Sequence, residues 1–456
     1  MSSEYGSSHA KKCLVPLLVV YVLGILCLQA FNLVFQKIGA DVGAAEQASL
    51  ITAIPGVILG IVCFVYASLS DFVPLKRMTI VGFVLLLVGS VFGFFFHDSL
   101  ALVIFARSVQ TAGAQIAGSV FLVVAARYLE PSEKVVFFGI FTAGYQLSTA
   151  IGVLAGGFLS TVGWSFLFLI PVLGVVFLPA IMRNLPDNTT TAGKVDVPGF
   201  LVFGLGIALL TLFFSFRNWL LLVGALVLFA AFFVYIGRAK APFVTPDFFR
   251  NRRWLASSAL VIVFYLPCYG VSPLINGIGS SLYGLDSAQV SLFLLWGNLA
   301  GALLGTLSGK IMGRIGRERT LILAGCLSTI GLSAAALLLN SGMTAIVPAL
   351  MAFYAGQGLL YSPIVDTVLS TLPPEQSGRG IGMNDLVMNA SESVGIAIFG
   401  GLIGTSFLSG SSVVGVTGSA ANFSNLLLIF ATVELVALVL YFAVRGMLAQ
   451  RPSKEV

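Results

Sequence analysis

Long apolar segments limit what this chain can fold into more than any other feature of its sequence. A helix needs about 20 mainly apolar residues to cross a lipid bilayer, and fourteen such stretches are present. They cover residues 13–35, 48–70, 78–96, 100–126, 135–160, 164–182, 198–216, 219–237, 255–278, 289–312, 320–339, 345–368, 380–407 and 423–444. Backbone groups in lipid must satisfy their own hydrogen bonds, and the alternating pattern of barrel strands is absent. We therefore expect an all-α membrane protein with fourteen transmembrane helices.

The composition supports this interpretation, because few charged residues are left to cover a surface in water. Hydrophobic residues make up 58% of the chain and charged residues 9%, whereas a soluble domain carries about 25% charged residues. The cysteines all lie in apolar stretches and lack metal-ligand or disulfide spacing; they are Cys13, Cys27, Cys63, Cys268 and Cys326. With only His9 and His97, and no nucleotide-binding loop or nucleophile arrangement, an enzyme is not expected. Neither a cofactor nor a metal is expected.

The positive charges are sorted by loop, and this sorting predicts the direction of each span. Lys and Arg favour the cytoplasmic side of a membrane. With the N-terminus inside, all 24 Lys and Arg fall in inside segments except Lys37 and Arg217, which fall outside, and Arg107, which lies within a span. The net charge of +6 therefore reflects membrane orientation, and nucleic-acid binding is not expected. Both termini are predicted to be cytoplasmic, and this holds even if stretches 198–216 and 219–237 only dip into the bilayer.

The second half of the chain echoes the first at an offset near 243 residues. Ala112-Gly113 matches Ala355-Gly356, and Gly139 and Gly152 match Gly382 and Gly395. The echo follows the order of the stretches, so it predicts two six-helix bundles with two helices inserted between them. We expect an N-terminal bundle at 1–183, a linker with the inserted helices at 184–254, and a C-terminal bundle at 255–456. Repeats of this kind place a substrate site near the bilayer midplane, between the halves.

Carboxylates lie within the spans of the second half only, at Asp366, Asp385, Glu392 and Glu434. A charge at bilayer depth costs about 2.5–3.5 kcal/mol, so such residues are functional candidates by default. Burial disfavours the charged form, which lets Glu392 take up and release a proton as its surroundings change. Asp385, Asn389 and Glu392 are spaced to share one helix face. Each acid also has an alternative role that needs no proton transfer. Glu392 would be permanently protonated, and Asp385 would anchor the start of its helix. Asp366 would lie in water at the membrane surface, and Glu434 would point inward or stay neutral.

Several short motifs follow one another in order along the chain. Residues 67–77 form the loop after the second stretch, and residues 107–113 read Arg-Ser-Val-Gln-Thr-Ala-Gly. These resemble the cytoplasmic signature and the Arg-x-x-Gln-Gly motif of the major facilitator superfamily. Residues 125–129, 163–171, 391–401 and 424–428 resemble its Gram-positive tetracycline exporters, which are fourteen-span drug:proton antiporters. The resemblance covers nearly the whole chain and implies the major facilitator fold.

The resemblance also implies roles for charged residues. It places Arg107 in the cavity wall, where it would help to couple protonation to the movement of the halves. It places Asp366 on a span that lines the cavity, and it matches Glu392 to a position that is also acidic in the family. It further implies a cytoplasmic gate that latches helix ends, formed by Asp71, Lys76, Arg77 and Arg127. The alternative for these four is ordinary positive-inside anchoring.

Ten polar side chains within the spans are candidates for contact with substrate, although each is equally suited to hydrogen bonds between helices. They are Gln29, Asn32, Gln110, Gln115, Tyr145, Gln146, Asn276, Asn298, Gln357 and Tyr361.

Together these features predict a monomeric, proton-coupled transporter of a bacterial inner membrane that exports amphipathic, often cationic drugs by alternating access. Its partners would be protons, the small amphipathic substrate and the lipid bilayer. Residues 27–29 read Cys-Leu-Gln where the family usually carries an acidic or polar pair, and Gly152-Val153 replaces a usual Gly-Pro. These departures argue against tetracycline as the substrate and leave room for a transport-dead sensor or scaffold. A tetracycline-specific exporter and an exporter of an endogenous metabolite are the further alternatives.

Overall fold

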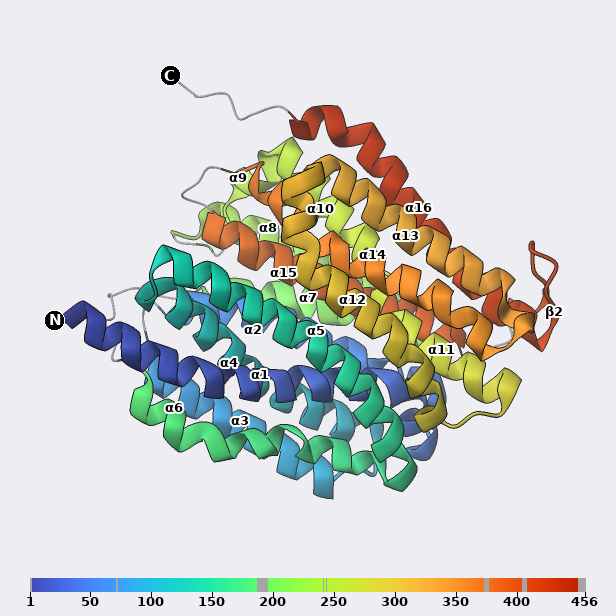
Figure 1. The fold of residues 1–456 in the computed structure, drawn as a ribbon, viewed down its shortest axis with the longest axis horizontal. Helices are drawn as coiled ribbons and strands as arrows, with labels where there is room; N and C mark the ends of the chain where they lie inside the picture. Colours follow the sequence, from blue (N-terminus) through green and yellow to red (C-terminus); the bar gives the residue numbers. More distant parts are fainter. Residues whose placement is uncertain are drawn as a thin grey trace.

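The computed structural model describes residues 2–70, 73–186, 196–240, 242, 244–372, 377–403 and 408–449. Within these residues, fourteen helical segments are long and apolar enough to cross a membrane. The predicted all-α fold with fourteen spans is therefore confirmed. The helices lie side by side in one bundle, and α1 begins at the end of the bundle where α16 ends (Figure 1).

The N-terminal half contains α1 (Ser2–Asp41), α2 (Leu50–Leu69), α3 (Leu75–Phe95), α4 (Leu100–Tyr128), α5 (Pro131–Val162) and α6 (Leu178–Asn184). Next come α7 (Val197–Phe216), α8 (Trp219–Arg238) and the short α9 (Pro246–Arg250). The C-terminal half contains α10 (Arg252–Tyr265), α11 (Cys268–Tyr283), α12 (Ser287–Ile315), α13 (Arg317–Leu337), α14 (Met343–Leu369), α15 (Ser377–Ile403) and α16 (Ser419–Ala449). Short 3-10 turns cover Ala45–Gln47 and Leu339–Ser341, and β1 (Gly410–Ser411) pairs with β2 (Thr417–Gly418) before α16.

Polar residues begin several of these helices, because the first backbone N–H groups of a helix have no partner within it. Ser99, Asp196 and Asn251 accept hydrogen bonds from the first turns of α4, α7 and α10. Asp286 forms a capping box with Gln289 at the start of α12. These caps mark where apolar segments reach the ends of the bundle.

Two spans that look continuous in sequence are irregular in the structure. The ninth breaks after Tyr265 and resumes at Cys268 as α11, because Pro267 lacks the N–H that a continuous helix requires. The sixth consists of 3-10 turns over Trp164–Leu169 and Pro171–Phe177 before α6 begins. The break in the ninth span brings the Leu266 carbonyl so close to Gly395 of α15 that a Cβ there would lie 1.7 Å from the oxygen.

The internal repeat is visible in how helices pack. Gly113 of α4 lies against the backbone of Leu86 in α3, where a Cβ would meet the amide nitrogen at 2.1 Å. In the second half, Gly356 of α14 lies against the backbone of Ser328 in α13 in the same way. Small residues let helices approach closely in lipid, and here the same approach recurs at equivalent places in the two halves.

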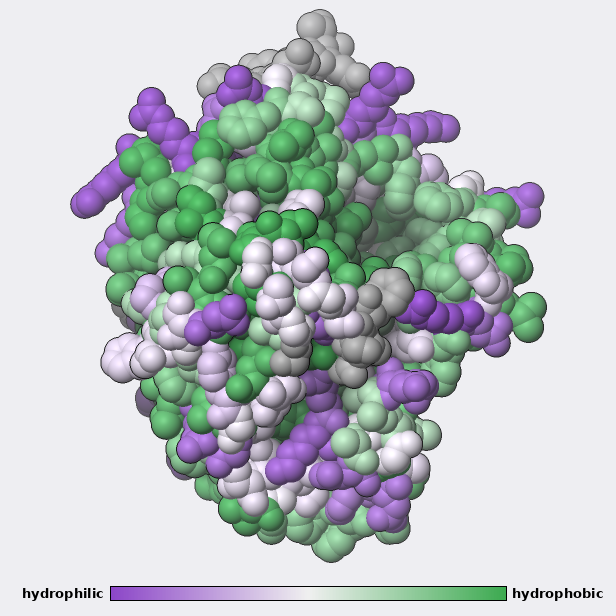
Figure 2. All heavy atoms as spheres, turned by 90° about the vertical axis from the view of Figure 1, so that its right-hand side faces the viewer, coloured by the Kyte–Doolittle hydropathy of each residue, from purple (hydrophilic) through white to green (hydrophobic). Residues whose placement is uncertain are grey.

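Helices α1 to α6 pack mainly on one another, as do α10 to α16, and the two groups meet where α5 contacts α12, α2 contacts α15 and α1 contacts α11. Helices α7 and α8 pack against each other, and α7 also contacts α2 and α15. Many apolar side chains of α8 are exposed, among them Trp219 and Leu220, as expected for a surface that faces lipid. Figure 2 looks onto the end of the bundle opposite the start of α1, where hydrophilic and apolar side chains mix.

Candidate functional site

A central cavity of about 1060 Å³ lies between the two groups of helices. Its lining comes from α1, α2, α4, α5, α10, α11, α12, α14 and α15, together with Asp196 and Phe200 beside and within α7. Ser70 and Arg127 line it near the end of the bundle where α1 begins, and Asn32 of α1 lines its opposite, inner part. The cavity therefore reaches from one end of the bundle past its middle.

The bundle is closed at the other end of the cavity. The Asn276 side-chain amide of α11 donates a hydrogen bond of 3.3 Å to the Leu33 carbonyl of α1. Gly157 of α5 lies so close to α12 that a Cβ there would come within 2.5 Å of the Ser287 carbonyl. Buried apolar residues of both halves join in one core around these contacts, including Phe31 and Leu274. Among the described residues, these contacts join the halves at one end, and the cavity separates them at the other.

Two carboxylates project from one face of α15 into the cavity. Glu392 is only 6% exposed and lies against the hydroxyl of Tyr269. Asp385, two turns earlier, is half-buried and accepts hydrogen bonds from the Tyr361 hydroxyl at 3.2 Å and from the Asn384 amide at 3.3 Å. Asn389 lines the cavity between them. Among the described residues, neither carboxylate forms an ion pair.

Tyrosines surround this acidic face, and the sequence pattern did not single most of them out. Six line the cavity: Tyr21, Tyr145, Tyr265, Tyr269, Tyr354 and Tyr361. Aromatic faces attract organic cations when water is excluded, and their rings also bind apolar surface. A phenol inside an apolar span needs a hydrogen-bond partner. This requirement could have identified Tyr265, Tyr269 and Tyr354 as candidate cavity residues from the sequence.

Eight of the ten polar residues predicted to contact substrate line the cavity: Gln29, Asn32, Gln115, Tyr145, Gln146, Asn298, Gln357 and Tyr361. The other two are engaged elsewhere. Gln110 donates to the Ser90 hydroxyl and the Phe168 carbonyl, both at 2.9 Å. Asn276 closes the far end of the bundle, as described above.

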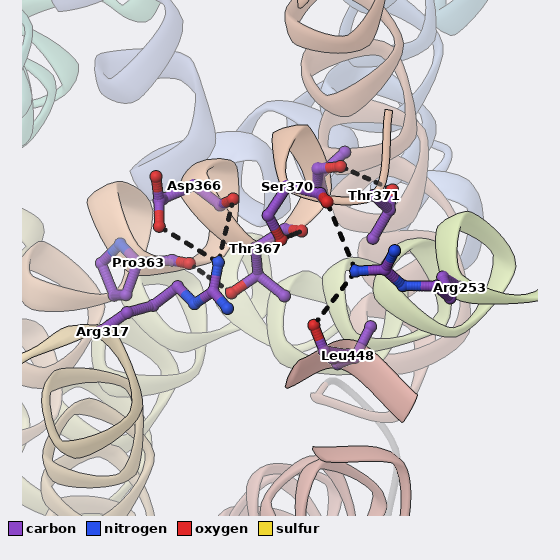
Figure 3. A network of polar contacts seen from close by, with 9 residues as sticks. Arg253, Arg317, Pro363, Asp366, Thr367, Ser370, Thr371 and Leu448 are labelled. Carbon is purple, nitrogen blue, oxygen red and sulfur yellow. Dashed lines mark hydrogen bonds and ion pairs between the residues drawn. The ribbon is translucent and has the colours of Figure 1, made fainter. Parts of the chain in front are cut away.

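Two of the predicted acids do not line the central cavity. Glu434 of α16 is fully buried, accepts a 2.8 Å hydrogen bond from the Gln357 amide, and leaves its second oxygen without a partner. Asp366 is exposed near the end of α14 and forms an ion pair of 3.2 Å with Arg317 (Figure 3). Figure 3 also shows Arg253 reaching backbone carbonyls beside this pair, so the end of α14 is held by cations from two other helices.

Arg107 of α4 is 2% exposed and lies outside the lining of the central cavity. Its Nη1 donates to the Gln110 carbonyl oxygen at 2.6 Å and to the Cys27 sulfur at 3.6 Å. Its guanidinium carbon stands 4.2 Å from the centre of the Phe31 ring. A smaller cavity of about 10 Å³ adjoins it.

Of the predicted gate residues, Arg127 lines the cavity, Lys76 and Arg77 do not, and Asp71 falls outside the described residues. Arg127 ends α4 and donates to the carbonyl and the hydroxyl of Ser70 at 3.1 and 2.9 Å. Lys76 is half-buried and Arg77 exposed in the first turn of α3. Within the described part of the chain, no three His, Cys, Asp or Glu side chains gather where a metal ion would bind.

Comparison with known proteins gives a consistent result. The sequence model of the Major Facilitator Superfamily matches residues 17–396. The chain is 24% identical over 361 residues to the multidrug resistance protein Stp of Mycobacterium tuberculosis, covering 76% of this chain and 67% of that protein. It is 24% identical to multidrug resistance protein 3 of Bacillus subtilis, with coverage of 80% and 74%. It is also 25% identical to a probable actinorhodin transporter of Streptomyces coelicolor, with coverage of 82% and 70%.

Solved structures show the same fold. A mutant peptide transporter POT in complex with sulfate superposes with a TM-score of 0.69 at 14% identity, covering 96% of this chain and 95% of that one. An auto-inhibited peptide transporter of the POT family gives a TM-score of 0.65 at 15% identity, with coverage of 97% and 99%. Sequence identities this low show a shared fold and do not indicate a shared function.

Proposed function

The chain belongs to the Major Facilitator Superfamily, and from that premise we propose that it exports amphipathic, often cationic compounds in exchange for protons. It is a multi-pass membrane protein, and its family and structural relatives are membrane transporters rather than enzymes. Relatives named as multidrug resistance proteins support drugs as the substrate class. We assign it to a bacterial inner membrane as a monomer that binds protons and substrate but no nucleic acid.

One observation carries this proposal: a large cavity with an aromatic wall contains two carboxylates that have no cationic partner among the described residues. A buried carboxylate without a cationic partner favours either a proton or an organic cation as its counter-charge. Tyr265, Tyr269 and Tyr361 add aromatic faces beside Asp385 and Glu392. Such a site accepts a flat cationic molecule through charge, stacking and apolar contact together.

Competition between a proton and the cationic substrate for the Glu392 carboxyl would couple their movement in opposite directions. A cationic substrate that enters the cavity displaces the proton of protonated Glu392 and pairs with the resulting carboxylate, and the proton leaves to the side that the cavity faces. When the cavity faces the opposite side, a proton from that side neutralises Glu392 and releases the substrate. Asp385 takes part as a second proton or charge site nearer the mouth, since Tyr361 holds its side chain toward the cavity.

The sorting of positive charge implies that the open end of the cavity faces the cytoplasm, with both termini on that side. This structure then represents the inward-facing state. Export requires the contacts between α1 and α11, and between α5 and α12, to separate at the outer end while the inner end closes. Arg127 and Ser70, which line the mouth, are suited to take part in that closure.

An exporter of an endogenous metabolite is the second candidate, because one relative is a probable actinorhodin transporter. The cavity's neutral hydrogen-bonding side chains, including Gln29, Gln146 and Asn298, would suit an uncharged compound with hydrogen-bonding groups as well as a cation. A transport-dead scaffold is a third alternative, and it predicts no substrate movement at all.

The experiment that tests the proposal is uptake of ethidium and of tetracycline into proteoliposomes driven by a pH gradient. Wild type is compared with Glu392→Gln and with Glu46→Gln, which makes the same change at an exposed loop residue. We expect uptake by wild type and Glu46→Gln and none by Glu392→Gln. If no variant moves either compound, the drug-export proposal fails; if Glu392→Gln transports normally, the role of this carboxyl fails.

A further inference from the structure

Arg107 is a buried base whose hydrogen-bonding capacity is largely unused. A guanidinium carries five N–H donors. The hydrogen bonds that Arg107 makes within the described chain both come from Nη1, to Gln110 and Cys27. Its Nε is buried without a partner. A side chain that is 2% exposed has no bulk water to satisfy the remaining donors.

The charge of Arg107 is also unbalanced. Its two hydrogen-bonding partners are neutral: Gln110 is an amide, and the Cys27 thiol donates toward the Leu167 carbonyl at 3.3 Å, as a protonated thiol does. Phe31 contributes only the face of its ring. No carboxylate among the described residues pairs with Arg107. A buried charge without a counter-charge is strongly unfavourable.

A small cavity adjoins these unused donors. Its volume of about 10 Å³ accommodates about one water-sized particle. Besides Arg107, its lining includes Thr111, which is 6% exposed and whose hydroxyl is also buried without a partner. Two independent unpartnered groups therefore meet at one space.

The small cavity lies next to the central one. Tyr21, Ile25, Leu59 and Gln115 line both. The space beside Arg107 is therefore separated from the central cavity by side chains and not by a whole helix.

We propose that this side chamber binds one small monovalent anion of the size of chloride. The anion accepts hydrogen bonds from Arg107 and from the Thr111 hydroxyl and supplies the negative charge that no described residue supplies. Water would satisfy the donors but leave the charge unbalanced. The space holds about one water-sized particle, so we expect a monatomic anion to bind in preference to sulfate or phosphate.

Cys27 offers a sharp test, because its sulfur already lies 3.6 Å from Nη1 of Arg107. Cys27→Asp places a carboxylate in contact with the guanidinium and makes the bound anion redundant. Cys27→Ser is the matched control, since it leaves the site without a negative charge. Binding of radiolabelled chloride to purified protein in gluconate buffer, with no transported substrate present, gives the direct readout.

We expect wild type and Cys27→Ser to bind about one chloride per chain, displaced by bromide and not by sulfate, and Cys27→Asp to bind none. The melting temperature of wild type should rise by about 2 °C or more in chloride relative to gluconate, and that of Cys27→Asp should not change. If Cys27→Asp does not fold, Thr111→Val is measured in its place. Its affinity for chloride should be about tenfold lower than that of wild type. Absence of saturable chloride binding in wild type, or undiminished binding in folded Cys27→Asp or Thr111→Val, would overturn the proposal. These measurements do not depend on transport, so they stand apart from the export proposal.

Discussion

Asn276 donates its amide hydrogen bond to the backbone carbonyl of Leu33, and the two residues are 243 positions apart. This separation equals the offset between the two internal repeats, so the bond joins equivalent positions of the two halves. It therefore lies where the pseudo-twofold relation between the halves brings α1 and α11 together, at the closed end of the cavity. Opening the protein at that end requires this bond to break.

Asn276→Ala should make the closed end open more often. Loss of a hydrogen bond worth about 1 kcal/mol changes the ratio of closed to open molecules about fivefold. Spin labels on the exposed residues Glu46 and Ser281, one in each half at that end, report the change as a larger population of long distances. Asn184→Ala, at the other end of the N-terminal half, serves as control. An unchanged distance distribution in Asn276→Ala would show that apolar packing alone keeps this end closed.

Tyr269→Ala should weaken ethidium binding about 2- to 30-fold, the range expected for loss of a cation–π contact worth about 0.5–2 kcal/mol. Tyr269→Phe keeps the ring and should stay within about twofold of wild type. Fluorescence titration of ethidium with purified protein measures both. Equal weakening by the two variants would assign the effect to the hydroxyl beside Glu392 instead of to the ring.

Two variants of Glu434 distinguish a role in stability from a role in coupling transport to protons. Glu434→Ala removes one of the two acceptors of the half-buried Gln357 amide, leaving the Ser328 hydroxyl, and should lower the free energy of unfolding by about 1–3 kcal/mol. Glu434→Gln keeps an acceptor oxygen and should retain most of the stability. Because Glu434 lies outside the cavity lining, we expect uptake driven by a pH gradient to persist in Glu434→Gln. Loss of that uptake in a variant with normal melting behaviour would make Glu434 a coupling residue.

Asp366→Asn should change little. Its ion pair with Arg317 is exposed, and such pairs contribute about 0–1 kcal/mol. Transport rate and its dependence on the pH gradient should match wild type, since the side chain lies outside the cavity lining. A transport defect as large as that expected for Glu392→Gln would restore Asp366 to the coupling machinery.

The number and order of the spans could be predicted from the sequence, because in lipid the length of an apolar segment and helix formation are tied together. The break after Tyr265 could not, since averaged hydropathy does not register one proline such as Pro267. The spacing of Asp385, Asn389 and Glu392 predicted a common helix face, and all three line the cavity.

The rest of the candidate site depends on three-dimensional packing. Asp366 and Glu434 look alike in an apolar sequence, yet one lies at a helix end exposed to solvent and the other inside a helix interface. Helix tilt and neighbouring helices decide between these outcomes, and neither is encoded in local spacing. Tyr269 was overlooked for the same reason: its ring suits packing and binding equally, and only the position of Glu392 beside its hydroxyl distinguishes them.

The central claim is that protons and a cationic substrate compete for Glu392. The most direct test is proton release when ethidium binds to purified protein in weakly buffered solution, followed with a pH indicator. The account predicts proton release by wild type and by Glu46→Gln, and its loss in Glu392→Gln. Ethidium binding to wild type without any proton release, or equal release by Glu392→Gln, would contradict it.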